Sequence, residues 1–123
     1  MPPRTALLVD DDPATGDSVR ELLPWRDVKL ESTADADEAI ECLKKHSYCG
    51  LVLNLDMYDD RALNLLTHLS DAGVNVPIVV IASKFPDSLR ELAIADHIKL
   101  VMSRPFDASL LAGMILGLCG IER

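Results

Sequence analysis

The stretch "ALLVDDDP", residues 6–13, is a run of four apolar residues followed directly by three acids and a proline. A short run that is apolar on both faces is typical of a central strand in a parallel sheet. Asp12 and Pro13 then predict the start of a helix, because aspartate is a favoured N-cap and proline a favoured first helical residue. The stretch therefore predicts a buried strand that leads straight into a helix.

The same alternation of apolar runs and helical periods continues along the whole chain, and it predicts βαβ units with a parallel sheet. We expect strands at Ala6–Val9, Lys29–Ser32, Leu51–Leu55, Ile78–Ala82 and Leu100–Met102, and helices near Ala14–Leu23, Ala36–His46, Arg61–Ser70, Ser88–Ala95 and Ala108–Cys119. Gly73, Asp107 and Gly120 are expected at helix ends. Five βα units use all 123 residues, so one domain, residues 1–123, is predicted.

The expected architecture is a doubly wound α/β fold of the flavodoxin-like type, with a five-stranded parallel sheet in the order 2-1-3-4-5. In such a sheet the functional crevice lies at the carboxyl ends of strands 1 and 3, where the winding direction reverses. The residues at the expected strand ends are Asp10, Asp11 and Asp12, then Asn54 and Asp56, then Ala82 and Ser83, and finally Ser103, Arg104 and Pro105.

Composition limits the classes of protein that this chain can represent. A formal net charge of −8 argues against binding of nucleic acid, because contacts to phosphate need a basic face. The apolar runs are far shorter than a membrane span and no leader pattern is seen, so a soluble cytoplasmic protein is expected. Three cysteines, Cys42, Cys49 and Cys119, have no metal-ligand spacing, and we expect reduced and mostly buried thiols.

Three segments together carry a resemblance to a known family: "ALLVDDDP" with its acidic pair, "PIVVIAS" at 77–83 and "VMSRPF" at 101–106. They resemble the first, fourth and fifth strand segments of response-regulator receiver domains (CheY-like). The resemblance covers the whole chain. It implies a signalling domain that binds Mg²⁺ at the acidic pair and accepts a phosphoryl group on an aspartate after the third strand.

The register of the third strand places Asn54 at that phosphoacceptor position. Receivers have methionine three residues after the acceptor, and Met57 is three residues after Asn54. Asp56 then falls two residues after the acceptor position, where the family uses mainly a backbone carbonyl on the metal. A carboxamide is a poor nucleophile and brings no charge to a metal, so the resemblance implies a degenerate receiver. We expect the Asn54 amide to bond to Asp10 or Asp11.

Other positions that the family uses have also changed. The hydroxyl residue after the fourth strand falls on Ala82, with Ser83 adjacent; the switch aromatic falls on Val101, the lysine on Arg104, the proline at +4 on Tyr58 and the glycine at +8 on Ala62. We expect Arg104 to bridge to Asp10 and Asp11 in place of a metal, or else to point to solvent. Weak Mg²⁺ binding by Asp10, Asp11 and Asp56 stays open. The family resemblance implies a cis bond before Pro105, whereas trans is expected from sequence alone.

The last helix has more apolar residues than one face can hold. Receivers typically dimerise or hold partners through helix 4, strand 5 and helix 5, and the matching candidates here are Leu110, Leu111, Met114, Ile115 and Leu118. The alternative is a tightly packed helix in which Gly113 and Gly117 allow close approach. Trp25 is expected to pack at a loop, and His46, His68 and His97 are expected on the surface.

The sequence therefore favours a pseudo-receiver, without enzymatic activity or a required cofactor, that acts in two-component signalling as a protein-interaction or dimerisation module. The alternative is a Mg²⁺-dependent switch that takes phosphate on Asp56, or a receiver whose natural aspartate was changed to Asn54. A domain that binds flavin or nucleotide is a weaker third reading, because three acids follow the first strand where a phosphate-binding loop would be needed.

Overall fold

A computed structural model of the chain describes residues 3–56, 61–84 and 87–121. In chain order these residues form β1 (Arg4–Val9), α1 (Pro13–Arg20), β2 (Val28–Thr33), α2 (Ala36–Lys45), β3 (Gly50–Asn54), α3 (Arg61–Asp71), β4 (Ile78–Ile81), the 3₁₀ helices η1 (Asp87–Glu91) and η2 (Ala93–His97), β5 (Ile98–Met102) and α4 (Ala108–Leu118). The predicted alternation of strands and helices is confirmed, with ends that differ by a few residues.

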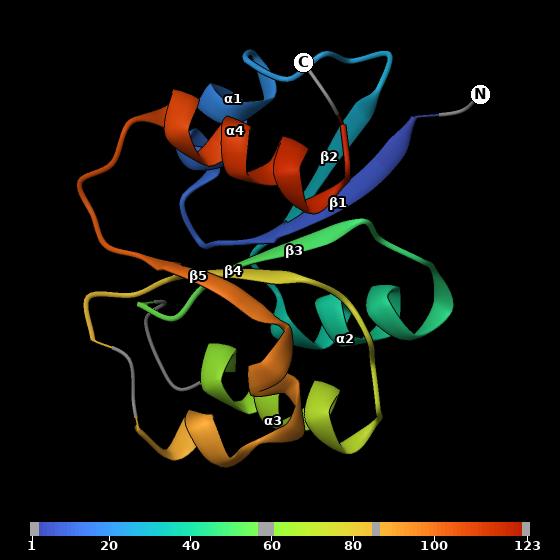
Figure 1. Ribbon diagram of the computed structural model, residues 1–123, viewed down its shortest axis with the longest axis vertical. Helices are drawn as coiled ribbons and strands as arrows, with labels where there is room; N and C mark the ends of the chain where they lie inside the picture. The colour runs from blue at the N-terminus through green and yellow to red at the C-terminus, as the bar shows by residue number, and fades with distance from the viewer. Residues whose placement is uncertain (1–2, 57–60, 85–86, 122–123) are drawn as a thin grey trace.

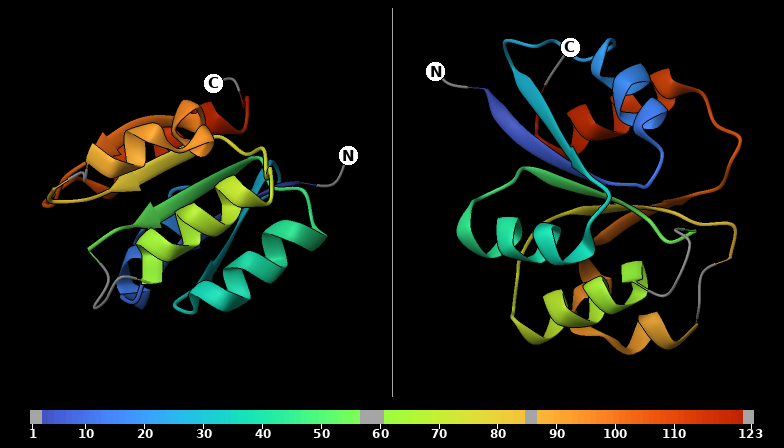
Figure 2. Two further views of the ribbon diagram at one scale, coloured as in Figure 1. Left: turned by 90° about the horizontal axis from the view of Figure 1, so that it is seen from below. Right: turned by 180° about the vertical axis from the view of Figure 1, so that it is seen from behind.

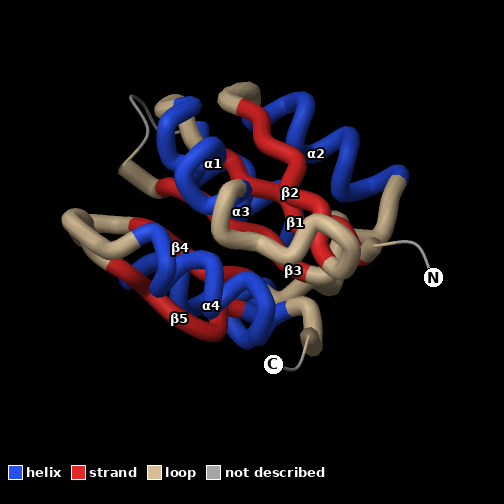
Figure 3. The backbone as a smooth tube through the Cα atoms, turned by 90° about the horizontal axis from the view of Figure 1, so that it is seen from above, coloured by secondary structure: helices blue, strands red, loops and turns tan. Residues whose placement is uncertain are grey.

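The strands form one parallel sheet in the order β2-β1-β3-β4-β5, as the sequence predicted. Figure 1 shows this sheet edge-on between two groups of helices, and Figure 3 shows the strands (red) with helices on either side. β3 is buried along its whole length. The order places β1 and β3 side by side at the centre, where the winding direction reverses.

Helices cover both faces of the sheet (Figures 1 and 2). α1 and α4 pack together on one face, while α2 and α3 lie on the other face with η2 against α3. β1 serves both cores by strict alternation, because Ala6 and Leu8 pack with the residues under α1 and α4, and Leu7 and Val9 with those under α2 and α3. The apolar run at residues 6–9 is thus explained by burial on both faces of the sheet.

The predicted helix ends agree with the structure at four positions. The Asp12 carboxylate accepts a hydrogen bond from the Ala14 amide at 2.9 Å, and Asp107 accepts one from the Ser109 amide at 3.2 Å. Gly73 and Gly120 have φ values of 67° and 68°, in the left-handed region where a side chain is disfavoured. α1 ends at Arg20, earlier than the predicted Leu23.

The segment predicted as a helix at 88–95 is instead two short 3₁₀ helices, η1 and η2. Leu92 separates them with an extended backbone, φ −78° and ψ 144°. Hydrogen bonds of the α type cannot run through an extended residue, so the apolar period in this segment does not produce one continuous helix.

The prediction of three reduced, mostly buried cysteines is wrong for two of them. Cys49, just before β3, and Cys119, at the end of α4, form a disulfide with 4.6 Å between their Cα atoms. Seventy residues separate them in sequence, and only the fold brings them together. Cys42, on α2, is a free thiol and only partly buried.

Two further expectations concern the surface. Trp25 does not pack at its loop, because it is 75 % exposed and its ring contacts the Arg26 guanidinium at 4.9 Å. His46 and His68 are exposed and His97 partly so, as expected. Within the described part of the chain, no helix is long and apolar enough to cross a membrane.

Candidate functional site

The register of the sheet brings the candidate residues together at its carboxyl edge. Val9 pairs with Leu53, so the residues that follow them, Asp10 and Asn54, lie side by side. Asn54 pairs with Ile81 on its other side, and Ile81 pairs with Met102. Residues just beyond β4 and β5 therefore reach the same edge. Parallel strands alone dictate this convergence.

Asn54 and Asp10 form a buried pair at the centre of this edge. The Asn54 Nδ2 atom donates a hydrogen bond to Asp10 Oδ1 at 3.0 Å, and Asn54 Oδ1 accepts one from the Asp56 amide at 2.8 Å. Asn54 is 4 % exposed, so both ends of its side chain find partners out of contact with bulk water. The predicted bond from the Asn54 amide to an acid of the first strand end is confirmed, with Asp10 as the partner.

Arg104 supplies the positive charge at this edge. Its Nη2 atom lies 2.8 Å from Asp10 Oδ2, and the same atom donates to Thr15 Oγ1 at 3.4 Å. The guanidinium also lies over the Phe106 ring, 5.3 Å from its centroid. The predicted ion pair with Asp10 is confirmed, whereas the other expected partner, Asp11, is exposed to solvent.

The Asp10 carboxyl is ionised because of these contacts. Burial of the group raises its pKa, but hydrogen bonds from Asn54, the Asp12 amide and Thr15, together with the Arg104 charge, outweigh that effect. The net result is a pKa of Asp10 below its usual value. Asp10 is thus a buried anion that the protein's own groups neutralise.

Asp56 lies in a different arrangement. Its carboxylate accepts hydrogen bonds from the Ser83 amide at 2.9 and 3.1 Å and from the Ser83 hydroxyl at 3.0 Å. These bonds tie the end of β3 to the end of β4. Ser83 thus holds Asp56, beside the buried Ala82.

The arrangement does not fit a divalent metal at the acidic pair. Both oxygens of Asp10 are engaged, Oδ1 by Asn54 and the Asp12 amide and Oδ2 by Arg104. A guanidinium 2.8 Å from a would-be ligand would repel a cation of charge two. Among the described residues, no three acidic, imidazole or thiol side chains form a group suited to a metal ion.

The structure also describes Val101, Pro105 and Ala62, which fall at other positions that the family uses. Val101 is 42 % exposed on β5, and the Arg104–Pro105 peptide bond is cis, as the family resemblance implied. Ala62 is fully buried at the start of α3. Met57, which sets the register of the third strand, and Tyr58, at the proline position, lie outside the described residues.

Sequence reasoning did not single out two residues of the site. Thr15 is a buried residue of the first turn of α1 that bonds to Arg104 and Asp10, and Phe106 supports the guanidinium from the far side. A hydroxyl residue one turn after an acidic strand end could have suggested the role of Thr15, because the first turn of such a helix faces the crevice. Phe106 ends the quoted segment "VMSRPF", but the resemblance gave it no role.

Comparison with known proteins shows the family to which this chain belongs. The model of the response regulator receiver domain matches residues 6–116. The chain belongs to this family. Its match to the cell cycle transcriptional regulator CtrA of Caulobacter vibrioides is 24 % identical over 100 residues, covering 81 % of this chain and 43 % of that protein. The chain thus spans less than half the length of the curated relatives it matches.

Solved receiver structures share the fold. A response regulator receiver protein from Burkholderia phymatum is 23 % identical with a TM-score of 0.71, and 97 % of each chain is covered. The receiver domain of the Francisella response regulator 1452 is 17 % identical with a TM-score of 0.75, covering 95 % of this chain and 97 % of that chain. The five-stranded receiver fold is therefore established for this chain.

The candidate partner surface on the last helix of this receiver domain is smaller than predicted. Leu111 and Ile115 are 0 % and 1 % exposed and belong to the core, because they point at the sheet. Leu110 is 48 % exposed, while Met114 and Leu118 are partly exposed. The groove between α4 and β5 has a volume of about 500 Å³ and is lined by Pro77, Val79, Lys99, Leu100, Gly113, Met114, Gly117 and Leu118.

The two glycines of α4 do not serve close packing. No described atom outside their own helix backbone lies within 4 Å of a Cβ built at Gly113 or Gly117. Both residues are exposed on the groove side of the helix. They leave the groove open, so the alternative of a helix that is simply packed tightly is not supported at these positions.

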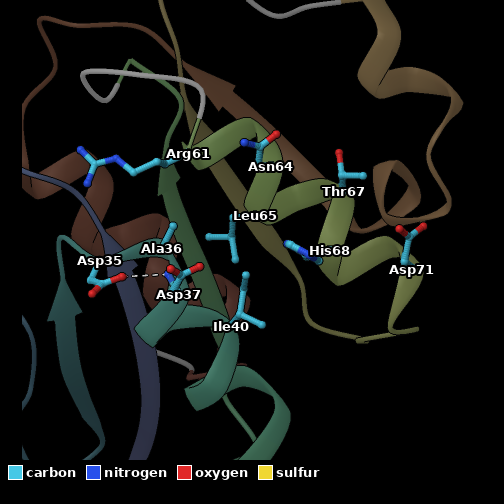
Figure 4. A pocket seen from close by; sticks show the side chains of 10 residues that line it. All are labelled: Asp35, Ala36, Asp37, Ile40, Arg61, Asn64, Leu65, Thr67, His68 and Asp71. Atoms are coloured by element: carbon cyan, nitrogen blue, oxygen red, sulfur yellow. Dashed lines mark hydrogen bonds between the residues drawn. The ribbon is translucent and has the colours of Figure 1, made fainter.

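A second hollow of about 280 Å³ lies between α2 and α3 (Figure 4). Asp35 and Asp37 lie on its α2 side, and His68 and Asp71 lie on α3. Its lining includes no member of the cluster around Asp10. The hollow is thus a surface feature separate from the site at the strand ends.

Proposed function

We propose that this receiver domain does not accept a phosphoryl group and acts as a protein-interaction module in two-component-type signalling. The observation that carries the proposal is the closed set of contacts around Asp10. An amide takes the acceptor position and donates to Asp10, and Arg104 neutralises the same carboxylate. Phosphoryl transfer needs an ionised nucleophile and a cation that offsets the charge of the donor. An amide at the acceptor position is a poor nucleophile, and the Arg104 charge on Asp10 opposes the binding of a cation there, which supports the proposal.

The alternative is that Asp56 accepts the phosphoryl group. Its side chain is exposed, which would allow a phosphodonor to approach. Its oxygens, however, accept hydrogen bonds from the Ser83 amide and hydroxyl, and these would have to break or rearrange before attack. The hydrogen bonds occupy lone pairs of the carboxylate oxygens that would attack a phosphodonor. The contacts favour a structural role for Asp56.

Incubation with Mg²⁺ and acetyl phosphate, followed by intact mass measurement, tests the proposal. We expect no phosphate adduct and no saturable Mg²⁺ binding. An adduct would overturn the proposal, and its loss in an Asp56→Asn variant would assign the alternative site. A variant with Ser18→Asn controls for a polar change on an exposed residue.

As proposed, the interaction surface is the apolar face formed by β5 and α4, and its occupant is a second copy of this chain or a protein partner. Leu100 on β5 and Leu110 on α4 are 38 % and 48 % exposed, whereas Val101, which is 42 % exposed, alternates to the opposite face of the sheet. Exposed apolar side chains gathered on one face favour association. The proposal assigns no enzymatic activity, no required cofactor and no contact with a membrane. It also assigns no contact with nucleic acid, in keeping with the net charge of −8.

Light scattering as a function of concentration tests self-association through this face. We expect Leu110→Lys to lower the average mass if a homodimer forms. Leu22→Lys is the matched control, because Leu22 is 45 % exposed but lies beyond the end of α1. A dimer that both variants leave intact would exclude this face as its interface.

A further inference from the structure

The disulfide lies far from the strand-end site, at the opposite end of β3. Cys49 immediately precedes Gly50, the first residue of β3, whereas Asn54 is the last. Cys119 is the C-cap residue of α4. The bond therefore joins the last turn of the final helix to the entry of the central strand.

The two cysteines differ in exposure. Cys119 is 2 % exposed and belongs to the core under α1 and α4, while Cys49 is only partly buried beside it. Thiol–disulfide exchange requires attack along an open path to one of the two sulfurs. Cys49 is the more exposed residue of the pair, so we expect a small thiol to attack its sulfur and Cys119 to be the leaving sulfur. The third cysteine, Cys42, packs against the other core, on the far face of the sheet.

Noncovalent contacts hold the end of α4 together with the disulfide. The Arg4 guanidinium donates a hydrogen bond to the Cys119 carbonyl, and the Ile121 amide donates to the Leu116 carbonyl at 2.9 Å. Leu118 sits directly over Gly50, because a Cβ at Gly50 would lie 2.9 Å from Leu118 Cδ1 and 3.0 Å from its Cβ. The disulfide adds a covalent link to these noncovalent contacts.

The same leucine connects the disulfide to the apolar groove. Leu118 lines the groove between α4 and β5 and is the direct neighbour of Cys119. The opposite wall, which includes Leu100, belongs to the edge strand β5 and is not attached to the disulfide. Breaking the disulfide would therefore remove a constraint beside one wall of the groove and none beside the other.

We propose that Cys49 and Cys119 are a reversible thiol–disulfide couple that controls the position of the end of α4 and, with it, the shape of the groove. The proposal deepens the proposed function, because it makes the interaction face responsive to the redox state of small thiols. The chain is large enough to fold around its aliphatic cores without a covalent staple, so the bond is not required for a stable domain of this size.

The exchange is balanced with a monothiol of the glutathione class. Its thiolate attacks Cys49 Sγ, the Sγ–Sγ bond breaks, and Cys119 leaves as a thiolate that takes up a proton. A second thiolate attacks the outer sulfur of the mixed disulfide, so that Cys49 is released as a thiolate, takes up a proton, and a small disulfide forms. The protein gains two electrons and two protons, which the two small thiols supply.

A redox titration of the folded chain tests the couple. The protein is equilibrated in buffers with varied ratios of reduced to oxidised glutathione, quenched with an alkylating reagent and weighed intact. We expect one reversible transition between one and three alkylated thiols in the wild type. Cys42→Ser should keep the transition, with one thiol fewer in each state. Three alkylated thiols in the most oxidising buffer, or a disulfide that is reduced only after unfolding, would overturn the proposal.

Hydrogen exchange provides the structural readout. We expect the Cys119 and Ile121 amides, which close the last turn of α4, to lose protection on reduction in both the wild type and Cys42→Ser. Cys49→Ser should show no dependence on the redox buffer. Equal protection in both states would show a disulfide without control over α4 and overturn the proposal. A phosphate adduct in the mass assay described above would overturn the proposed function and leave these results unaffected.

Discussion

Replacement of Asn54 by aspartate is the sharpest perturbation of the strand-end site. In the wild type, Asn54 Nδ2 donates to Asp10 Oδ1 at 3.0 Å. Asn54→Asp would put a carboxylate oxygen in place of that donor, facing a buried anion. The variant restores the residue type that the family uses for phosphoryl transfer, but within a cluster that already contains its own cation.

The expected loss of stability follows from the distance. Two unit charges at about 3 Å repel by roughly 5 kcal/mol at an effective dielectric constant of about 20. Protonation of one carboxyl limits the cost, because binding a proton to a group of ordinary pKa near 4 at neutral pH costs about 4 kcal/mol. Arg104 offsets part of the repulsion. We therefore expect Asn54→Asp to lower the free energy of unfolding at pH 7 by about 2–4 kcal/mol.

Urea denaturation at pH 7, with and without Mg²⁺, measures this loss. Asn75→Asp is the matched control, because it makes the same change in charge at an exposed residue. We expect the control to stay close to the wild type in stability. We also expect Mg²⁺ to recover part of the loss in Asn54→Asp alone, since a divalent cation can compete with Arg104 for two carboxylates but not for one.

A variant with Asn54→Asp as stable as the wild type, in the absence of Mg²⁺, would refute this reasoning. It would mean that Asp10 and residue 54 can separate at little cost, and that the amide is not needed to satisfy the buried carboxylate. The same experiment at a pH near 4 provides an internal check, because protonation should remove most of the difference between the variant and the wild type.

Three further outcomes are expected. Arg104→Met should lower the free energy of unfolding by about 1–2 kcal/mol, discounted because the Arg104 side chain is 39 % exposed, whereas Arg90→Met, at an exposed pair, should be near neutral in urea denaturation. The folded-state pKa of Asp10 is lowered, so its contribution to stability is present above the unfolded value of about 3.8 and is lost as pH falls through the folded value; Asp10→Asn should lack this acid-dependent part in pH-dependent denaturation. Gly50→Ala should lose about 1–3 kcal/mol in thermal unfolding through overpacking against Leu118, while Gly113→Ala, which has open space at its Cβ, should gain up to about 1 kcal/mol of helix propensity; equal effects would contradict the packing at Gly50.

The fold could be predicted from sequence because its determinants are local. Apolar runs such as residues 78–82 are long enough to identify buried strands, and single residues such as Asp107 and Gly120 mark helix ends through their own hydrogen bonding or backbone conformation. The strand order could be predicted because doubly wound sheets of five strands commonly adopt it. The site residues at the strand ends could be predicted because parallel strands bring their carboxyl ends to one edge.

Contacts between distant segments could not be predicted. Nothing in the spacing of Cys49 and Cys119 indicates that they meet, since their distance depends on how α4 crosses the sheet. The burial of Leu111 and Ile115 depends on which side of an almost uniformly apolar helix faces the core, and such a helix carries little directional signal. The sequence placed Ser83 only next to Ala82, whereas in the structure Ser83 donates a hydrogen bond to Asp56. This contact depends on the turn geometry at the ends of two strands.

Arg104 also bears on what the domain can sense. A bound magnesium ion exchanges with the medium, so a site that requires one follows the free concentration of the metal. A guanidinium that is part of the chain has a fixed local concentration, which no chelator and no shortage of metal can lower. The positive charge beside Asp10 is therefore present whenever the chain is folded. It does not depend on the concentration of metal ions around the protein.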